Sequence, residues 1–244
     1  MKQILARPNT SIHYTLFTLH ALPMPKQVLK REGWERPTSR YPDQSIVDAI
    51  LGICEYGAPI GYEDSRTSVT IHANLSSAEE DPSMVTAEII SELKKNRLEL
   101  YPDYRSLPNH YTASPLGLTD KSEGSKRRIH QLSYPAGDPS AINHGIPEEY
   151  GAITYCGIED TIRAIQLFSP KCILIKRDFE AAFHHIPVSP LDTPLLGFQW
   201  QKQFNAERFV SFGLRTAPYL FNQFAEVFHW TLEPSYARRT WSRL

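Results

Sequence analysis

The chain is poor in cysteine, has no long apolar run and carries almost no net charge. Its three cysteines, Cys54, Cys156 and Cys172, show no paired spacing. This argues against a disulfide framework or a zinc ribbon and fits a reducing, intracellular location, without distinguishing nucleus from cytoplasm. No apolar stretch reaches the roughly 18 residues of a spanning helix, so we expect no membrane association. The formal net charge of −1 gives no overall argument for nucleic acid, and residues 32–120 are acidic.

Several common catalytic motifs are also missing. The sequence has no Walker loop, no glycine-rich dinucleotide fingerprint, no nucleophile elbow and no zinc-ligand spacing. The usual sequence signs of a nucleotide hydrolase, a dehydrogenase, a serine hydrolase or a zinc enzyme are therefore absent. Any function has to be inferred from other residues.

The N-terminal third divides into two predicted regions. Residues 1–42 carry five of the 19 prolines, show no sustained hydrophobic period and are predicted to form an irregular arm. The basic, acid-free start of this arm would also suit a transit peptide, but Pro8, Pro23 and Pro25 interrupt it and favour a disordered arm. Residues 43–110 are predicted to form a helical N-terminal region.

Two helices are predicted within that region. Apolar residues recur on one helical face over 44–56, and Gly57 is a suitable stop. Asp81 followed by Pro82 gives an N-cap and a proline at the first helical position of the second helix. The residues expected to form its buried stripe are Val85, Ile89, Ile90 and Leu93.

Strands and helices alternate from residue 111 onward. The predicted elements are a hairpin at 114–133, a helix from about Ile158 that ends at Ser169-Pro170, a buried strand at 172–175, a second hairpin at 195–210, and a helix from Thr216 to about Leu232. Because no regular βαβ rhythm appears, the predicted fold class is α+β.

Asp178 follows closely on the predicted buried strand, after Lys176 and Arg177. A buried carboxylate is unfavourable unless it is paired or bound to a metal ion. The sequence leaves both readings open: Asp178 could cap the next turn or pair with a neighbouring cation, or it could be a metal ligand.

Four stretches, in the same order and with similar spacing, resemble the reverse transcriptases of retroelements, in detail those of the tyrosine-recombinase retrotransposon type. They cover roughly residues 84–232 and are ELKKNR at 92–97 with SPLGL at 114–118, RRIHQLSYP at 127–135, DFEAAFHHIPV at 178–188, and LGFQW at 196–200 with FGLRTAPYLFN at 212–222. The first two resemble the fingers and the last two the first palm motifs. The resemblance implies a partial right-hand polymerase over 111–244, acting on an RNA template, a DNA primer and deoxynucleotides.

The resemblance also implies roles for the residues around Asp178. Nucleotidyl transfer uses two Mg²⁺ ions about 3.5–4 Å apart. Asp178 would bridge both ions, helped by the carbonyl of Phe179. Phe183 would lie against the sugar and exclude a 2′-hydroxyl, because a rigid ring cannot satisfy an extra hydroxyl. A plain core aromatic remains an open reading of Phe183.

Further roles follow for the hairpin and for the second palm motif. Arg127, and Lys121 in the preceding turn, match cations that grip the incoming triphosphate, a role that suits the planar donor fork of arginine. A solvated basic turn is the alternative. Phe212 and Gly213 match the place where the backbone passes beneath the nascent base pair, which requires glycine for close approach. An ordinary turn leading into a helix is the alternative there.

The chain departs from this family pattern mainly by what it lacks. Ala181, Gln131 and Ser211 replace usual residues and look tolerable, but the hairpin with two adjacent aspartates has no counterpart. Two divalent ions at about 4 Å repel each other by roughly 17 kcal/mol at an effective dielectric of 20, which one carboxylate does not offset. We therefore expect a polymerase truncated before this hairpin and inactive on its own.

Three other hypotheses remain at this point. Lys126, Arg127 and Arg128 on one hairpin, with aromatics nearby, would suit a non-catalytic RNA-binding module. His184 and His185 beside Asp178 would suit a metal hydrolase, although adjacent strand residues point to opposite faces. A third hypothesis is an unstable fragment of low solubility, in which the apolar helix face over 219–230 has no cover.

Overall fold

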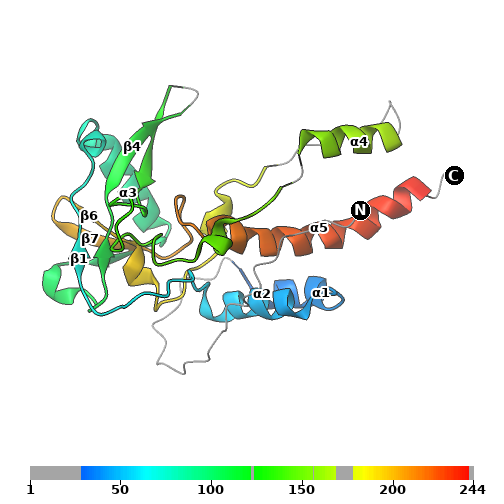
Figure 1. Ribbon diagram of the computed structural model, residues 1–244, viewed down its shortest axis with the longest axis horizontal. Helices are drawn as coiled ribbons and strands as arrows, with labels where there is room; N and C mark the ends of the chain where they lie inside the picture. The colour runs from blue at the N-terminus through cyan, green and yellow to red at the C-terminus, as the bar shows by residue number, and fades with distance from the viewer. Residues whose placement is uncertain (1–28, 122–123, 156, 169–177, 242–244) are drawn as a thin grey trace.

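The computed structural model describes residues 29–121, 124–155, 157–168 and 178–241 (Figure 1). A sheet with α3 and a projecting hairpin forms one half, the sheet half, and α1 and α2 packed along α5 form the other, the helical half (Figure 1). The helices are α1 (Arg31–Thr38), α2 (Gln44–Tyr56), α3 (Pro82–Lys94), α4 (Ile158–Phe168) and α5 (Ala217–Trp241). The strands are β1 (Thr70–Ile71), β2 (Leu98–Tyr101), β3 (Thr112–Ala113), β4 (Leu116–Asp120), β5 (Lys126–His130), β6 (Gly197–Trp200) and β7 (Gln203–Glu207).

The larger sheet is mixed, with the strand order β1-β3-β6-β7-β2. β3 pairs in parallel with both β1 and β6, whereas β7 pairs antiparallel with β6 and β2. β6 and β7 form the second predicted hairpin. Gln201 and Lys202 occupy its two-residue turn with φ of 47° and 67°, the backbone twist that suits a tight hairpin. The mixed sheet and separate helices confirm the predicted α+β class.

The first predicted hairpin is also confirmed. β4 pairs antiparallel with β5 in a separate two-stranded sheet, with Leu116 opposite His130 and Asp120 opposite Lys126. Gly124 adopts φ of 80° in the connecting turn, a conformation that glycine reaches without strain. The hairpin rises from the sheet half beside α3 (Figure 1).

α3 begins and ends as the sequence predicts. The Asp81 side chain accepts a hydrogen bond from the Met84 N–H at 3.0 Å, and Pro82 occupies the first turn. Val85 and Ile89 are buried, as expected, against a cluster that includes Leu116 and Phe198. Ile90 was expected in the same stripe but is 46% exposed, because it lies to one side of the face set by the other residues.

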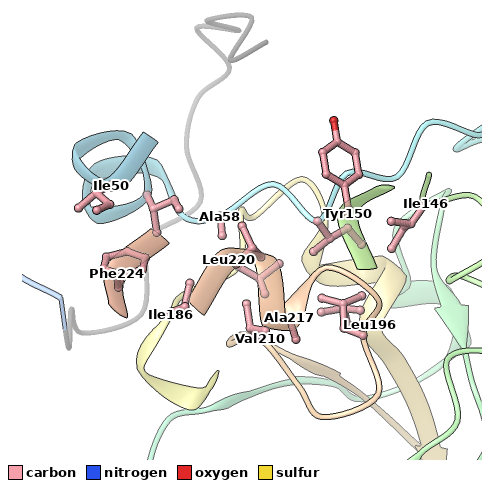
Figure 2. Close-up of a cluster of buried hydrophobic side chains, with 14 of the residues drawn as sticks. Ile50, Ala58, Ile146, Tyr150, Ile186, Leu196, Val210, Ala217, Leu220 and Phe224 are labelled. Carbon is pink, nitrogen blue, oxygen red and sulfur yellow. The ribbon is translucent and has the colours of Figure 1, made fainter. Parts of the chain in front are cut away.

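The helical half has an apolar core around the N-terminal part of α5. Figure 2 shows Leu220 and Phe224 of α5 in this cluster, with Ile50 of α2 beside Phe224. The Trp34 ring of α1 meets the Phe224 ring edge-on, with centroids 5.0 Å apart. The expectation that the face over 219–230 lacks cover is therefore wrong for Leu220 and Phe224, which are buried in this core, whereas Phe228 is 45% exposed.

Both boundaries of α2 are as predicted. The Asp43 side chain accepts from the Ser45 N–H at 3.1 Å at the start of the helix. Gly57 ends the helix with φ of 81°, and a Cβ at this position would lie 2.6 Å from the Val188 carbonyl oxygen. Glycine is thus required here both for the turn and for the close approach of another segment.

Two predicted segments differ from the structure. Residues 1–42 were expected to be irregular throughout, but 31–38 form α1, whose Glu32 and Arg36 suit the positive and negative ends of the helix dipole. Pro37 lies in the last turn of α1, where its missing N–H costs one bond. α5 extends to Trp241, beyond the predicted end near Leu232.

Thr216 begins α5 through its backbone. Its carbonyl accepts from the Leu220 N–H at 2.9 Å, while its hydroxyl donates to the Ile60 carbonyl at 3.0 Å. The predicted start of this helix at Thr216 is confirmed, and the hydroxyl ties the helix start to the chain after α2.

The predicted helix after residue 157 is present as α4. Ile158 and Leu167 are 68% and 81% exposed, and Figure 1 shows α4 away from the sheet half. The predicted buried strand at 172–175 lies outside the described residues. The boundaries at 42/43 and 110/111 stay predictions. Among the described helices, none has the length and apolar content needed to cross a membrane.

Candidate functional site

Phe183 and Phe212 come from two separate predicted motifs and meet in the structure. Phe183 lies in the short turn η4 (Ala182–His185), and Phe212 lies just before α5. Their ring centroids are 5.0 Å apart. Phe212 is 57% exposed, whereas Phe183 is half-buried against the core of the helical half. In this pair the Phe212 ring is accessible to solvent, and the Phe183 ring, which packs against the core, supports it.

Gly213 forms a close backbone approach beside this pair. Its φ is +95°, and a Cβ at this position would lie 2.9 Å from the carbonyl oxygen of His130, at the end of β5. Asn143 holds the bend in place: its Nδ2 donates to the Gly213 carbonyl at 2.7 Å and its Oδ1 accepts from the Arg215 N–H at 2.8 Å. The predicted requirement for glycine thus has a physical basis, although the approaching group is protein backbone.

Asn143 was not predicted from the sequence. It is buried, although it lies in an irregular stretch, and it also donates to the Ser133 hydroxyl at 2.8 Å. Nothing in the local sequence indicates these partners, because they come from the end of the hairpin and from the start of α5. The bend at Phe212-Gly213 is therefore fixed by long-range contacts.

The cations of the hairpin are divided between its two faces. Arg127 on β5 and Lys121 in the turn are exposed. Lys126 forms an ion pair with Glu80 at 2.6 Å. Alternation along the strand turns Arg128 inward, so the hypothesis of three cations on one binding surface is wrong for this residue. The exposed charge available to a phosphate is centred on Arg127.

Arg128 instead forms a buried ion-pair cluster. Its guanidinium lies 3.0 Å from a carboxylate oxygen of Glu207 and 3.2 Å from one of Glu88, and it sits over the Phe198 ring. Burial lowers its pKa, but these two carboxylates outweigh that effect and hold the pKa above its ordinary value. Arg128 therefore ties β5 to α3 and β7 instead of meeting a ligand.

His184 and His185 point to different partners. The Nδ1 of His184 lies 3.4 Å from Arg97 Nη1, while the Nε2 of His185 lies 3.1 Å from the Glu180 carbonyl oxygen. Burial, partly opposed by the Glu92 carboxylate, lowers the pKa of His184 to about 4. The two imidazoles do not converge, which leaves the metal-hydrolase hypothesis without support.

Asp178 and Phe179 lie at the edge of the described chain. Both are exposed. The Phe179 ring meets Phe221 and Phe228 of α5, with centroids 6.0 and 5.7 Å apart, and Phe221 in turn meets Phe183 at 6.0 Å. A continuous series of ring contacts thus connects the neighbour of Asp178 to the bend at Phe212.

The described residues do not form a complete metal site. Nowhere among them do three Asp, Glu, His or Cys side chains gather as metal ligands would. Asp178 and the Phe179 carbonyl could supply oxygen ligands of the kind that Mg²⁺ prefers, but this donor set does not fit a pair of ions. The role of Asp178 and Phe179 as metal ligands stays a prediction.

A separate recess of about 340 Å³ lies beside β1 and β3, and none of the predicted site residues lines it. Arg66 and His110 are among its lining residues, and Arg66 is engaged by the buried Asp192 carboxylate. Since its cation is already paired, this recess is a weaker anion site than the exposed Arg127.

No protein-family profile and no curated protein match this chain. Several solved structures are similar to it. The native protease-reverse transcriptase of prototype foamy virus is 14% identical, with a TM-score of 0.41, over 86% of this chain and 28% of that one. The foamy viral enzyme in complex with an RNA/DNA hybrid is 12% identical, with a TM-score of 0.43, over 86% and 28%.

A third structure, the foamy viral enzyme in complex with double-stranded DNA, is 13% identical, with a TM-score of 0.41, over 85% of this chain and 41% of that one. The chain thus spans less than half the length of these structures. The similarity to reverse transcriptases is present but remote, and TM-scores below 0.5 do not by themselves establish a shared fold.

Proposed function

We propose that this chain forms the fingers and part of the palm of a reverse transcriptase of the tyrosine-recombinase retrotransposon type. It binds nucleic acid and a deoxynucleotide, and these residues alone do not sustain efficient DNA synthesis. One observation carries the proposal: Phe183 and Phe212, from two motifs distant in the sequence, meet with ring centroids 5.0 Å apart beside the glycine that packs on the end of β5.

The arrangement suits a nucleotide for three reasons. The exposed Phe212 ring offers a flat apolar surface on which a base can stack. The half-buried Phe183 ring is held from behind by Phe221, so it can act as a rigid wall against a sugar. Arg127 is exposed on the adjoining hairpin, where its donor fork can reach a phosphate. Lys121 adds a second exposed cation in the hairpin turn.

Catalysis is the part of the family activity that this chain lacks in our proposal. Asp178 matches the first catalytic carboxylate, with Mg²⁺ as the expected ion and an RNA template and DNA primer as partners. A single carboxylate supplies too few of the oxygen ligands that two divalent ions require. Binding without turnover is therefore the expected behaviour.

A binding titration tests the first part of the proposal. We expect single-stranded RNA to bind with an affinity that falls steeply with salt, because phosphate contacts release counterions. The Phe212→Ala variant should bind about 5- to 150-fold more weakly, since one stacked base contributes about 1–3 kcal/mol. Tyr104→Ala is the matched control, because Tyr104 is equally exposed, at 59%, but lies outside the site. Equal losses in the two variants, or salt-independent binding, would contradict the proposal.

Primer extension tests the second part. With Mg²⁺ or Mn²⁺, we expect neither the unaltered chain nor Asp178→Ala to extend a primer on an RNA template. RNA binding without extension would also fit a non-catalytic binding module, the second candidate. The exposed Phe212 favours it, as does the lack of a metal-ligand group among the described residues. Extension that Asp178→Ala abolishes would show that another carboxylate completes the site.

A further inference from the structure

His184 lies between the bend at Phe212 and a charged group at the end of α3. On one side, its ring centroid is 5.9 Å from that of Phe212. On the other side, its Nδ1 is 3.4 Å from Arg97 Nη1 and 3.9 Å from a carboxylate oxygen of Glu92. The His184 side chain is only 17% exposed, so these neighbours define its environment.

Arg97 fixes the proton of this imidazole. A guanidinium has donors and no acceptor, so the Nδ1 of His184 must accept and the proton must lie on Nε2. Arg97 is itself held in place: its Nη1 is 3.2 Å from a Glu92 carboxylate oxygen, its N–H donates to the Glu92 carbonyl at 3.0 Å, and its carbonyl accepts from Arg208 at 2.9 Å. The Lys95 Nζ lies 2.7 Å from the other carboxylate oxygen of Glu92.

We propose that His184 is a positioning residue for Phe212, and that the Glu92–Arg97 pair sets the orientation of its imidazole. Phe212 is exposed, and the rings that contact it belong to Phe183 and His184. Glu92 and Arg97 contact His184 and each other, and His184 in turn meets Phe212 in a T-shaped ring contact, so the pair acts on Phe212 through the imidazole. This inference rests on the proposed function in one respect: it adds a link from α3 in the fingers to the residue that stacks on a base.

The charges around His184 make this link sensitive to acid. Burial, Arg97, Arg128 and Lys95 disfavour a proton on the imidazole, while Glu92 favours one, and the resulting pKa is about 4. A second proton removes the acceptor that Arg97 requires and places two cations side by side. Below that pH the His184 ring turns away from Arg97, and Phe212 loses one of its two supports.

Nuclear magnetic resonance of the full chain tests the link without any ligand. We expect a nuclear Overhauser effect between the His184 and Phe212 rings at pH 7, and Phe212 ring signals that move with the same midpoint as the His184 Cε1–H, near pH 4. Arg97→Met should raise that midpoint by about one pKa unit, a tenfold change in proton affinity, and should shift the Phe212 signals although residue 97 does not contact them. His185→Asn, the control, should change neither.

Phe212 signals that stay constant through the His184 titration, or the absence of the ring-to-ring effect at pH 7, would overturn the proposal. The titration of the unaltered chain decides the question even if Arg97→Met fails to fold. RNA binding separates this failure from that of the proposed function: His184→Ala should weaken binding about fivefold, and His185→Asn should not. A chain that binds no RNA but shows the coupled titration retains the positioning role and loses only the proposed ligand.

Discussion

The helical half and the sheet half are held together by different kinds of contact. Around α5 the buried contacts are apolar, and the ion pairs that α1 makes, Arg31 with Glu35 and Glu55, have exposed side chains. In the sheet half, by contrast, Arg128 and Glu207 form an ion pair with side chains only 6% and 3% exposed. The helical half therefore depends on packed volume, whereas the sheet half adds matched buried charge to its apolar clusters.

The difference bears on function because the candidate site lies at the junction. Phe183 packs against the apolar core of the helical half, while His184, the next residue, reaches the charged group on α3. Adjacent residues thus connect the site to both halves. A substitution that destabilises the helical half should therefore affect Phe212 through Phe183, and one that destabilises the sheet half should affect it through His184. The following predictions compare the two halves.

The largest effect is expected from removing the buried cation. Arg128→Met leaves the Glu207 carboxylate in the interior without a partner, which costs about 3–5 kcal/mol of unfolding free energy. Urea denaturation measures the loss. The double variant Arg128→Met with Glu207→Gln should recover much of it, because no buried charge is left unpaired. A loss below about 1 kcal/mol for the single variant would show that the sheet half does not depend on this pair.

The corresponding change in the helical half removes volume. Leu220 is fully buried, and Leu220→Ala should cost about 2–5 kcal/mol through lost burial and the cavity left behind. This loss should be equal at low and high salt, because Leu220 carries no charge. Leu100→Ala, at a 46% exposed position, is the control and should stay within about 0.5 kcal/mol of the unaltered chain. A loss in Leu220→Ala that changes with salt would show that charge also contributes to the stability of the helical half, against this prediction.

The same contrast explains what the sequence could predict. α2, α3 and the β4–β5 hairpin were predicted with accurate ends or turns because Gly57, Asp81 and Gly124 act within a few residues of themselves. The start of α5 at Thr216 was also predicted, although its hydroxyl bonds to the distant Ile60 carbonyl and only its backbone bonds locally, to the Leu220 N–H. In the helical half, the helical period predicted the buried face of α2. Core residues from segments outside the helices, such as Ile146 and Ile186, followed from no such pattern.

The charged contacts of the sheet half were not accessible in this way. Arg128 appeared as one of three similar cations, and only the fold reveals that Glu88 and Glu207 enclose it. The Asn143 contacts and the pairing of β2 with β7 likewise join distant segments. α1 was missed because Pro37 outweighed the charges that favour a helix. The motif resemblance assigned Phe183 and Phe212 to one nucleotide site but did not predict that their rings meet.

Acid should loosen the sheet half before the helical half. His130 and His184 are buried, which lowers their pKa values to about 3 and about 4. Because these folded-state values lie below the ordinary 6.5, their contribution is complete above about pH 6.5 and is lost as the pH falls toward 4. Amide exchange should therefore show that the free energy of local opening of β5 and η4 falls by on the order of 2 kcal/mol between pH 7 and pH 4, while that of α2 stays unchanged. Uniform opening of both halves would contradict this.

Two glycines test how tightly the bend is held. Gly213→Ala should cost about 2 kcal/mol, because φ of +95° strains a side chain and the Cβ would press on the His130 carbonyl oxygen. Gly124→Ala has a similar positive φ but no atom within 4 Å, so only the strain of about 1 kcal/mol applies. The two variants should differ more in RNA affinity than in stability, since only Gly213 adjoins Phe212. Equal effects on binding would remove the bend from the site.

The smallest effect is expected from the exposed ion pair next to the buried one. Lys126 and Arg128 lie on the same strand, but the Lys126 and Glu80 side chains are 33% and 58% exposed, so water screens their attraction. Lys126→Met should leave the urea midpoint unchanged within experimental error, at low and at high salt alike. Since it also removes a cation from the hairpin, any loss of RNA affinity in this stably folded variant reports phosphate contact directly. A large loss of stability in Lys126→Met would mean that the contribution of a hairpin cation to the free energy of unfolding depends on its position on the strand and not on its burial.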